Sequence, residues 1–241
     1  DNKDDNLTAR IELRPFGSYS VYTGYSLVND SEGKSDKVVF GQNYQVTKDF
    51  GIYSEHQLLK DPDARSTIEA YGISYKVKDN YTLGIAYQQG VVNENAGESY
   101  KRRAVSLSSS YDKSKFKLTN KFEYRIDNKS SLNEETYVTT NGFSVRLTDS
   151  LRGLANFDYS ISRDRETDET IERYSEANVG FAFRPVTNNR LAILGRYRNI
   201  QQEDNTSRTN VTDQKKEIFE AEVNYKLSNK WSIGGRIAYK D

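Results

Sequence analysis

The sequence contains no cysteine, no methionine and a single histidine in 241 residues. A chain without cysteine forms no disulfide and offers no thiolate to a metal ion. No stretch approaches the roughly 20 apolar residues of a membrane-spanning helix. No glycine-rich phosphate loop joins a strand to a helix, and helical periodicity is missing. These absences exclude disulfide scaffolds and helical membrane proteins, and they argue against nucleotide chemistry.

Charge of one dominant sign is also missing, because 35 Lys and Arg residues balance 35 Asp and Glu residues. Without a basic stripe to displace counterions, nucleic acid is not an expected partner. A signal peptide and a starting methionine are absent as well, which is typical of a processed chain or of an excised piece.

Hydrophobic residues make up only 35% of the chain, and the mean hydropathy is −0.86. Either a disordered chain or a β-structure with two different faces would have this composition. The 18 Tyr, 10 Phe and 1 Trp are spread along the whole sequence, whereas disordered segments are poor in aromatic residues. A water-filled barrel, in which one strand face meets lipid and the other meets water, accommodates such low hydropathy.

A strand-turn-strand pattern recurs along the chain, most clearly at Tyr75–Tyr87 and Tyr225–Tyr239, with related short turns at Val46–Phe50, Leu147–Leu151 and Val186–Arg190. Apolar and polar residues alternate on both sides of each turn, which indicates strands. We expect about fourteen strands, at 7–15, 19–28, 37–46, 51–60, 67–77, 81–92, 100–111, 115–126, 136–147, 151–162, 174–186, 190–202, 215–227 and 231–240. The predicted fold is all-β: an antiparallel up-and-down transmembrane β-barrel. Residues 1–241 are expected to form a single domain, of which residues 1–6 are a disordered or linker-like start.

Long, highly charged connections alternate with the short turns. They are expected at 29–36, 61–66, 93–99, 127–135, 163–173 and 203–214, lengthening toward the C-terminus. Their mixed charge is typical of solvated loops. The acidic residues Asp30, Glu32 and Asp36 could bind a divalent cation, but they lack the glycine-centred spacing of a calcium loop, so no metal site is predicted.

Aromatic residues gather at strand ends beside the short turns. Six are predicted to form a girdle at the membrane interface: Tyr75, Tyr81, Tyr111, Phe116, Tyr225 and Trp231. Cross-strand aromatic pairing in a water-soluble sheet is the alternative. A soluble sandwich or solenoid is disfavoured because a sandwich must turn its apolar faces toward each other.

The polar strand faces are where function is expected. The predicted pore-lining residues are Arg10, Glu12, Arg14, Lys121, Glu123, Arg125, Arg152, Asp158, Arg196, Arg198, Glu220, Glu222 and Arg236. Another part of the predicted lumen wall, the smooth arc, carries small residues instead of charged ones. They are Ala70, Gly72, Ser74, Gly84, Ala86, Ser106 and Ser108. Hydrated charges along a pore tune which ions pass, whereas the same ladders also brace a barrel wall. Because the predicted pore-lining residues carry charges of both signs, the sequence does not predict which ions the pore prefers.

His56 is the only imidazole, and Ser54 lies two residues away on the same strand face. Acyl transfer would need these groups in contact with each other and with a third, orienting group. Because no motif supports that arrangement, His56 is interpreted as structural. We therefore predict no enzyme activity, no cofactor and no zinc site.

In the pattern of Tyr75–Tyr87 and Tyr225–Tyr239, the chain resembles the porin-like outer-membrane β-barrel proteins of Gram-negative bacteria over residues 7–240. The end of the chain departs from that class, which commonly finishes on an aromatic residue, whereas this one finishes Tyr239-Lys-Asp241. The departure is typical of a trimmed chain or of the barrel part of a longer surface protein.

The resemblance implies a location in the bacterial outer membrane. It also implies contact with membrane lipid and lipopolysaccharide. Additional domains or partner subunits are compatible with the resemblance. We expect a pore that passes ions and small hydrophilic solutes by passive diffusion through a charged lumen. The alternative is a structural or anchoring barrel of a larger cell-surface or secretion protein, with a closed or plugged lumen.

Overall fold

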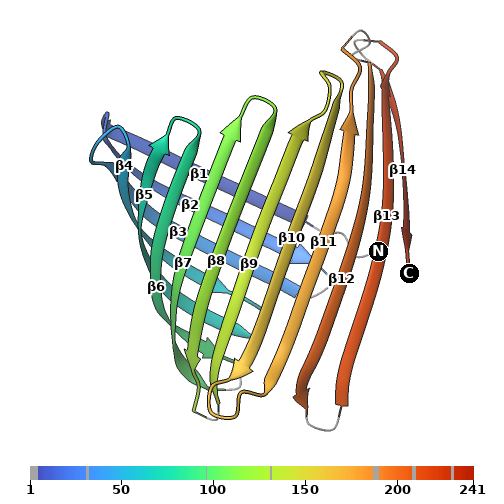
Figure 1. The fold of residues 1–241 in the computed structure, drawn as a ribbon. Helices are drawn as coiled ribbons and strands as arrows, with labels where there is room; N and C mark the ends of the chain where they lie inside the picture. The colour runs from blue at the N-terminus through green and yellow to red at the C-terminus, as the bar shows by residue number, and fades with distance from the viewer. Residues whose placement is uncertain are drawn as a thin grey trace. The chain divides into compact units, whose positions relative to one another are not determined.

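The computed structural model describes residues 5–30, 33–95, 97–130, 132–186, 190–207, 210–228 and 231–241. They form fourteen strands in one antiparallel sheet, hydrogen-bonded in the order in which they follow along the chain (Figure 1). The strands are β1 Asp5–Phe16, β2 Tyr19–Asp30, β3 Gly33–Gln45, β4 Phe50–Lys60, β5 Ala64–Lys78, β6 Tyr81–Glu94, β7 Ser99–Lys113, β8 Phe116–Asn128, β9 Asn133–Arg146, β10 Leu151–Asp164, β11 Thr170–Phe183, β12 Leu191–Ser207, β13 Asn210–Lys226 and β14 Ser232–Lys240. Within these ranges no helix is long and apolar enough to span a membrane.

Each predicted strand overlaps one observed strand, but the predicted long connections were wrong in extent. The expected loop 163–173 shrinks to residues 165–169 between β10 and β11. The expected loop 203–214 is mostly strand, because β12 and β13 each run for 17 residues. Backbone ladder bonds form regardless of side-chain polarity, so the strands continue into charged sequence. Residues 5 and 6 belong to β1, contrary to the expected disordered start, and residues 1–4 lie outside the described ranges.

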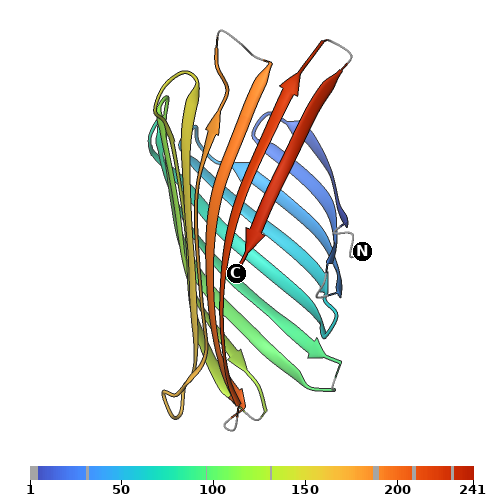
Figure 2. The ribbon, with the colours of Figure 1, turned by 90° about the vertical axis from the view of Figure 1, so that its right-hand side faces the viewer.

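The chain divides into two compact units. The first comprises 1–108, 123–136 and 164–167, and the second comprises 109–122, 137–163 and 168–241. In the first unit, β1 to β6 pair consecutively, and its buried apolar residues are mostly small or β-branched: Ile68, Ala70, Ala86, Val92 and Ala104, together with Tyr100. In the second unit, β10 to β14 pair consecutively, and β14 lies beside β13 (Figure 2).

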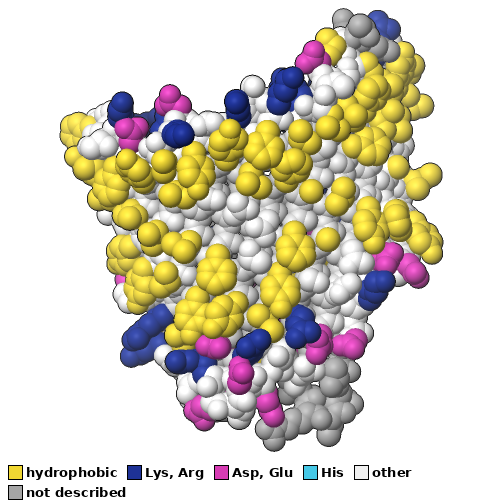
Figure 3. Space-filling view, in the orientation of Figure 1, with side chains coloured by type: hydrophobic (Ala, Val, Ile, Leu, Met, Phe, Trp, Pro, Cys, Tyr) yellow, Lys and Arg dark blue, Asp and Glu magenta, His cyan; other side chains and the backbone are white. Residues whose placement is uncertain are grey.

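Most strands have one apolar face that is open to its surroundings. In β1, Ile11 is 65% exposed, and in β14, Ile237 is 75% exposed. Hydrophobic side chains cover much of the face drawn in Figure 3, while Lys, Arg, Asp and Glu gather toward strand ends. Soluble monomers rarely expose apolar surface on this scale, so the face requires a non-aqueous surrounding.

Two of the short turns are built in the same way. In the β3–β4 turn, Thr47 Oγ1 accepts a hydrogen bond from Phe50 N at 3.0 Å. In the β9–β10 turn, Thr148 Oγ1 accepts one from Leu151 N, also at 3.0 Å. A threonine hydroxyl that satisfies the backbone in this way favours a tight reversal of the chain. The turns predicted from Val46–Phe50 and Leu147–Leu151 are therefore confirmed.

Candidate lumen-lining face

The face opposite the exposed apolar side chains carries most of the predicted pore-lining residues. In β1 of the first unit, Arg10, Glu12 and Arg14 alternate with Ile11 and Leu13. Glu12 accepts a hydrogen bond from Arg14 Nε at 2.9 Å, and Arg10 Nη2 lies 3.6 Å from Glu12 Oε2. The predicted charged ladder on this strand is thus present as contacts between neighbouring side chains.

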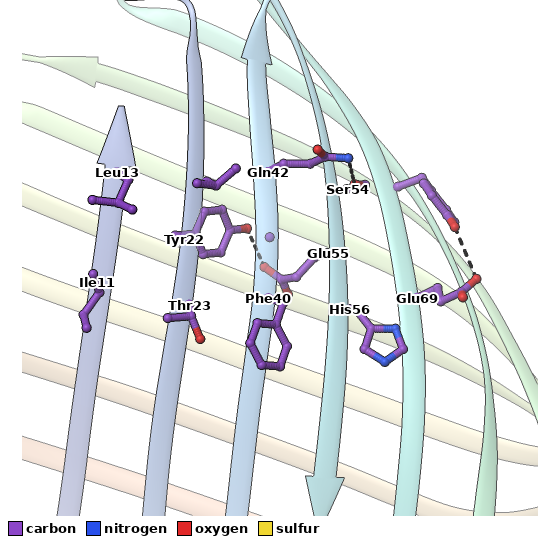
Figure 4. A pocket seen from close by; sticks show the side chains of 13 residues that line it. Ile11, Leu13, Tyr22, Thr23, Phe40, Gln42, Ser54, Glu55, His56 and Glu69 are labelled. Carbon is purple, nitrogen blue, oxygen red and sulfur yellow. Dashed lines mark hydrogen bonds between the residues drawn. The ribbon is translucent and has the colours of Figure 1, made fainter. Parts of the chain in front are cut away.

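Tyr22 extends that ladder across two further strands. Its ring lies under the Arg10 guanidinium, with 3.9 Å between Cζ and the ring centroid. Its hydroxyl donates to Glu55 Oε2 on β4 at 2.7 Å (Figure 4). The ring reaches β4 by lying across Gly41 of β3, where a Cβ atom would overlap it. Arg10, Tyr22 and Glu55 therefore form one connected network on this face.

Small residues form the predicted smooth arc on the same face of β5 to β7. Ala70, Ala86 and Ser106 are buried, although they were expected to line open water. Tyr53 of β4 accounts for part of the cover, because its ring lies across Gly72 of β5. The arc is therefore partly covered by aromatic side chains from a neighbouring strand.

One ion pair with a buried carboxylate joins β7 to β8 at the end of the first unit away from the short turns, and a second lies within β8. Arg102 Nε and Nη2 donate to the two carboxylate oxygens of Asp127 at 2.8 and 2.7 Å. Arg125 Nη2 donates to Glu123 Oε1 at 2.7 Å. The side chains of Asp127 and Glu123 are each 6% exposed, so these are interior pairs rather than surface ones.

Lys129 stands beside this region in the connection between β8 and β9. Its Nζ lies 3.2 Å from Glu134 Oε2 and 3.9 Å from Glu94 Oε1, and 5.1 Å from the centroid of the Tyr100 ring. Burial opposes the charge on the ammonium group, but the nearby carboxylates outweigh it and raise the pKa of Lys129. The ion pairs of Lys129 therefore stabilise the connection between β8 and β9.

In the second unit, Glu220 of β13 is the centre of a three-strand contact. It is buried, and its two carboxylate oxygens bind Arg196 of β12 and Arg236 of β14. The register places Arg196 and Glu220 directly opposite each other. Three of the predicted residues are thus brought together, with two positive charges on one negative charge.

A second network lies on β10 to β12. Arg198 Nε lies 2.6 Å from Glu176 Oε1, and Arg198 Nη2 donates to Glu176 Oε2 at 2.9 Å. The Tyr174 hydroxyl also donates to Glu176 Oε2, at 2.5 Å. Asp158 is the cross-strand partner of Glu176, and its Oδ1 atom is buried without a hydrogen bond among the described residues.

Arg152 and Glu222 line one pocket of about 760 Å³ in the second unit, together with Arg146, Arg184 and Asn224. Lys121 is exposed on β8, where it alternates with Phe122. Arg14, Arg152 and Lys121 are therefore more exposed than the buried carboxylates are. The polar face has both buried and exposed charged side chains.

The six predicted interface aromatics all lie next to short turns. Tyr81 and Phe116 begin β6 and β8, and Tyr111 lies near the end of β7 with its ring centroid 5.5 Å from that of Phe116. Tyr75 and Tyr225 are near the ends of β5 and β13, and Trp231 precedes β14 with 73% of its surface exposed. The girdle itself stays a prediction.

His56 and Ser54 lie on the apolar face of β4, away from the ion-pair networks. Ser54 Oγ accepts a hydrogen bond from Gln42 Nε2 at 2.9 Å. Asp36, one of the candidate cation ligands, accepts a hydrogen bond from the Tyr25 hydroxyl at 2.7 Å. Glu32 and the Asp30 side chain lie outside the described residues. Among the described residues, no group of three or more His, Asp or Glu side chains is placed to hold a metal ion.

Sequence reasoning missed several members of these networks. Tyr22 was not named, although its position between Val21 and Thr23 places it on the opposite face of the strand from these two residues. Glu55, Arg102, Asp127 and Glu176 were likewise not named. Their period-two positions were visible in the sequence, but their partners depend on cross-strand register.

Comparison with known proteins supports the fold. No protein-family model matches the chain, and neither does any curated protein sequence. The outer-membrane channel DcaP of Acinetobacter baumannii superposes with a TM-score of 0.59 and 10% identity, covering 98% of this chain and 84% of its own. OmpT, an outer-membrane protein of Vibrio cholerae, superposes with a TM-score of 0.57 and 6% identity, covering 98% of this chain and 87% of its own.

An anion-selective porin from Comamonas acidovorans gives a TM-score of 0.54 and 10% identity, covering 97% of this chain and 89% of its own. All three similarities extend over nearly the whole chain. The chain therefore has the antiparallel meander fold of the outer-membrane β-barrels, which confirms the predicted fold class and the resemblance in fold.

Proposed function

We propose that the chain is an outer-membrane pore that passes ions and small hydrophilic solutes by passive diffusion through a charged lumen. The observation that carries this proposal is the segregation of ionised side chains on one strand face. Arg196, Glu220 and Arg236 lie on that face in the second unit, and Arg10 and Glu55 do so in the first. Charges on a wetted wall remain hydrated and act on passing ions.

The pairing of these charges shapes the expected selectivity. Glu176 and Glu220 are each bound by arginine, so their negative charge is balanced locally. Arg152 is exposed on the polar face of β10, and Glu220 is contacted by two arginines, which leaves one positive charge in excess at that contact. We therefore propose a lumen with weak preference for anions over cations, because these positions carry more positive than negative charge.

Single-channel recording in a planar bilayer tests the proposal, after heat-modifiable gel mobility has established that the refolded protein is a barrel. Stable stepwise currents are expected, and in a salt gradient their reversal potential should have the sign of a mild anion preference. A folded and inserted barrel without current would contradict the pore. Cation-selective currents would support the pore but contradict the proposed preference for anions.

A second candidate is an anchoring barrel with a closed lumen. The contact that favours it is Glu220, which ties β12, β13 and β14 together and directs long arginine side chains along the wall. Such contacts brace a barrel and narrow it at the same time. The absence of current, combined with a normal heat-modifiable shift, is the result that this candidate predicts.

A further inference from the structure

The polar face of the second unit is hollowed at the end where the short turns lie. The pocket of about 760 Å³ extends there from the β9–β10 turn to β13. We call it the short-turn pocket, and its charged lining residues are Arg146, Asp149, Arg152, Arg184 and Glu222. Its volume is within the range of small-molecule sites, about 300–1,000 Å³.

Backbone pairing gathers the three arginines of the pocket. Leu147 N donates to Leu151 O at 2.9 Å. Arg146 and Arg152, the next residues on β9 and β10, are therefore cross-strand neighbours. Arg184 N donates to the backbone of the same turn at 2.7 Å. Like charges opposite each other destabilise a sheet, so this arginine cluster has an electrostatic cost that a bound anionic group would remove.

No protein group in the described part of the chain neutralises the arginine cluster. Arg146, Arg152 and Arg184 are exposed, and none of them has an ion pair or a side-chain hydrogen bond with another described residue. Guanidinium groups bind carboxylates through two parallel hydrogen bonds. The cluster is therefore open to a carboxylate from a solute.

An apolar floor separates the arginine cluster from a carboxylate of the protein. One register row crosses four strands, and its members all line the pocket: Arg152, Ala182, Leu194 and Glu222. A cation begins the row, two uncharged side chains follow, and an anion ends it. Three spacings between neighbouring strands place the backbones of Arg152 and Glu222 about 14 Å apart.

Glu222 is available to a positively charged group. It is exposed and has no ion pair among the described residues. Its cross-strand neighbour on β14 is Arg236, which contacts Glu220 instead. Asp149, the other carboxylate of the pocket, is exposed in the β9–β10 turn. With charges of both signs at its two sides, the pocket matches a ligand that carries both.

We propose that the short-turn pocket binds zwitterionic peptides of two or three residues, with the peptide carboxylate on the arginine cluster and its ammonium group at Glu222. The inference rests on the proposed pore, whose lumen would bring such solutes to the pocket. Extended chains span up to about 3.3–3.6 Å per residue, so two or three residues cover about 7–11 Å. The side chains of Arg152 and Glu222 cover the rest of the distance.

Charge matching favours such a peptide over simpler solutes. A plain anion would leave Glu222 without a partner, and a plain cation would face the arginine cluster. A single amino acid carries both charges, but they are separated by only one residue, about 3.6 Å at most. It therefore reaches one side of the pocket and not the other. Small peptide side chains would contact the floor formed by Ala182 and Leu194.

Isothermal titration calorimetry of the refolded barrel in detergent micelles tests the binding without requiring current. Trialanine should bind. Its N-acetylated form has lost the ammonium group and its C-terminal amide has lost the carboxylate, so each should bind at least about tenfold more weakly. Three equal affinities, or no heat of binding for trialanine, would overturn the proposal. Inorganic phosphate that binds as tightly as trialanine would show a plain anion site and would also overturn it.

Substitutions test which end of the peptide each side chain holds. Glu222→Gln should weaken trialanine about tenfold and leave acetyl-trialanine unchanged, because only the ammonium group meets Glu222. Arg152→Gln should weaken both peptides. The matched control Glu172→Gln removes a carboxylate from the same face of β11 near its other end, and it should change neither affinity. Equal losses in E222Q and E172Q would contradict the proposed contact.

Binding and conduction are measured separately, so the two proposals can fail independently. Current without trialanine binding would keep the pore and overturn the peptide site. Binding without current would keep the peptide site and overturn the pore. Heat-modifiable mobility establishes that each variant is folded, and the comparison of the three peptides on the unsubstituted protein needs no variant.

Discussion

The phenol ring of Tyr22 lies across Gly41, and this placement lets its hydroxyl reach Glu55 two strands away. A methyl group at residue 41 would overlap the ring, so Gly41→Ala should displace Tyr22 and break its hydrogen bond. We expect a loss of about 1–3 kcal/mol in the free energy of unfolding, measured by urea titration in detergent micelles. Gly235→Ala is the control, since no atom lies within 4 Å of a Cβ there. Equal losses in both variants would contradict the explanation.

Thr47 and Thr148 carry the same turn hydrogen bond to the backbone at the third residue after them. Replacing either with valine keeps the shape of the side chain and removes the acceptor. Each variant should lose about 1 kcal/mol of stability. Urea midpoints of T47V, T148V and the double variant should show additive losses, because the two turns lie in different units. Unchanged midpoints would mean that strand pairing alone sets the turns.

Asp127 is buried and accepts two hydrogen bonds from Arg102. Asp127→Asn leaves the guanidinium without its counter-charge, and we expect a loss of about 3 kcal/mol in unfolding free energy. Lys48→Ala serves as the comparison, because Lys48 is 90% exposed in its contact with Asp49 and such pairs contribute about 0–1 kcal/mol. A D127N variant as stable as K48A would show that the pair contributes little.

Glu220 is in contact with Arg196 and Arg236 at the same time and offsets part of their positive charge. Glu220→Gln should free both guanidinium groups and move the reversal potential of the pore further toward anion preference. Glu222→Gln removes the same formal charge two residues away and is the matched control. We expect the larger shift from E220Q. Identical shifts would mean that total lumen charge, rather than this contact, governs the current.

Lys129 has a raised pKa, with burial opposing and Glu134 and Glu94 favouring its charged form. A lysine whose folded pKa exceeds the usual 10.5 contributes stability fully below pH 10.5 and loses it as the pH rises through the folded value. Lys129→Arg keeps its charge throughout that range. Above pH 10.5, unfolding free energy should therefore fall more steeply in the unsubstituted protein than in K129R. Parallel curves would indicate that other groups control alkaline unfolding.

Alternation was sufficient to predict the strands and the short turns at Val46–Phe50 and Leu147–Leu151, because a strand with two different faces shows a period of two in its sequence. The turn predicted at Val186–Arg190 includes residues 187–189, which lie outside the described residues. The ends of the strands were not predictable in the same way. Residues 203–207 are polar, yet β12 continues through them, since the backbone pairing with β13 needs no apolar side chain. Polarity marks where lipid ends, whereas backbone pairing marks where a strand ends.

The polar face was predicted in outline, but its contacts were not. Arg196 opposite Glu220 requires the register of β12 on β13, which a single strand does not contain. Tyr22 was not named either, because the space that keeps its ring on the polar face is provided by Gly41 on the next strand.

The length of β12 and β13 has a practical consequence. A tilted strand needs about 9–11 residues to cross a bilayer, and each of these has 17. The surplus forms a hydrogen-bonded ribbon beyond the hydrocarbon, stiffened by its own backbone ladder. In the proposed membrane pore, a peptide inserted between the two strands would therefore stand away from the lipid.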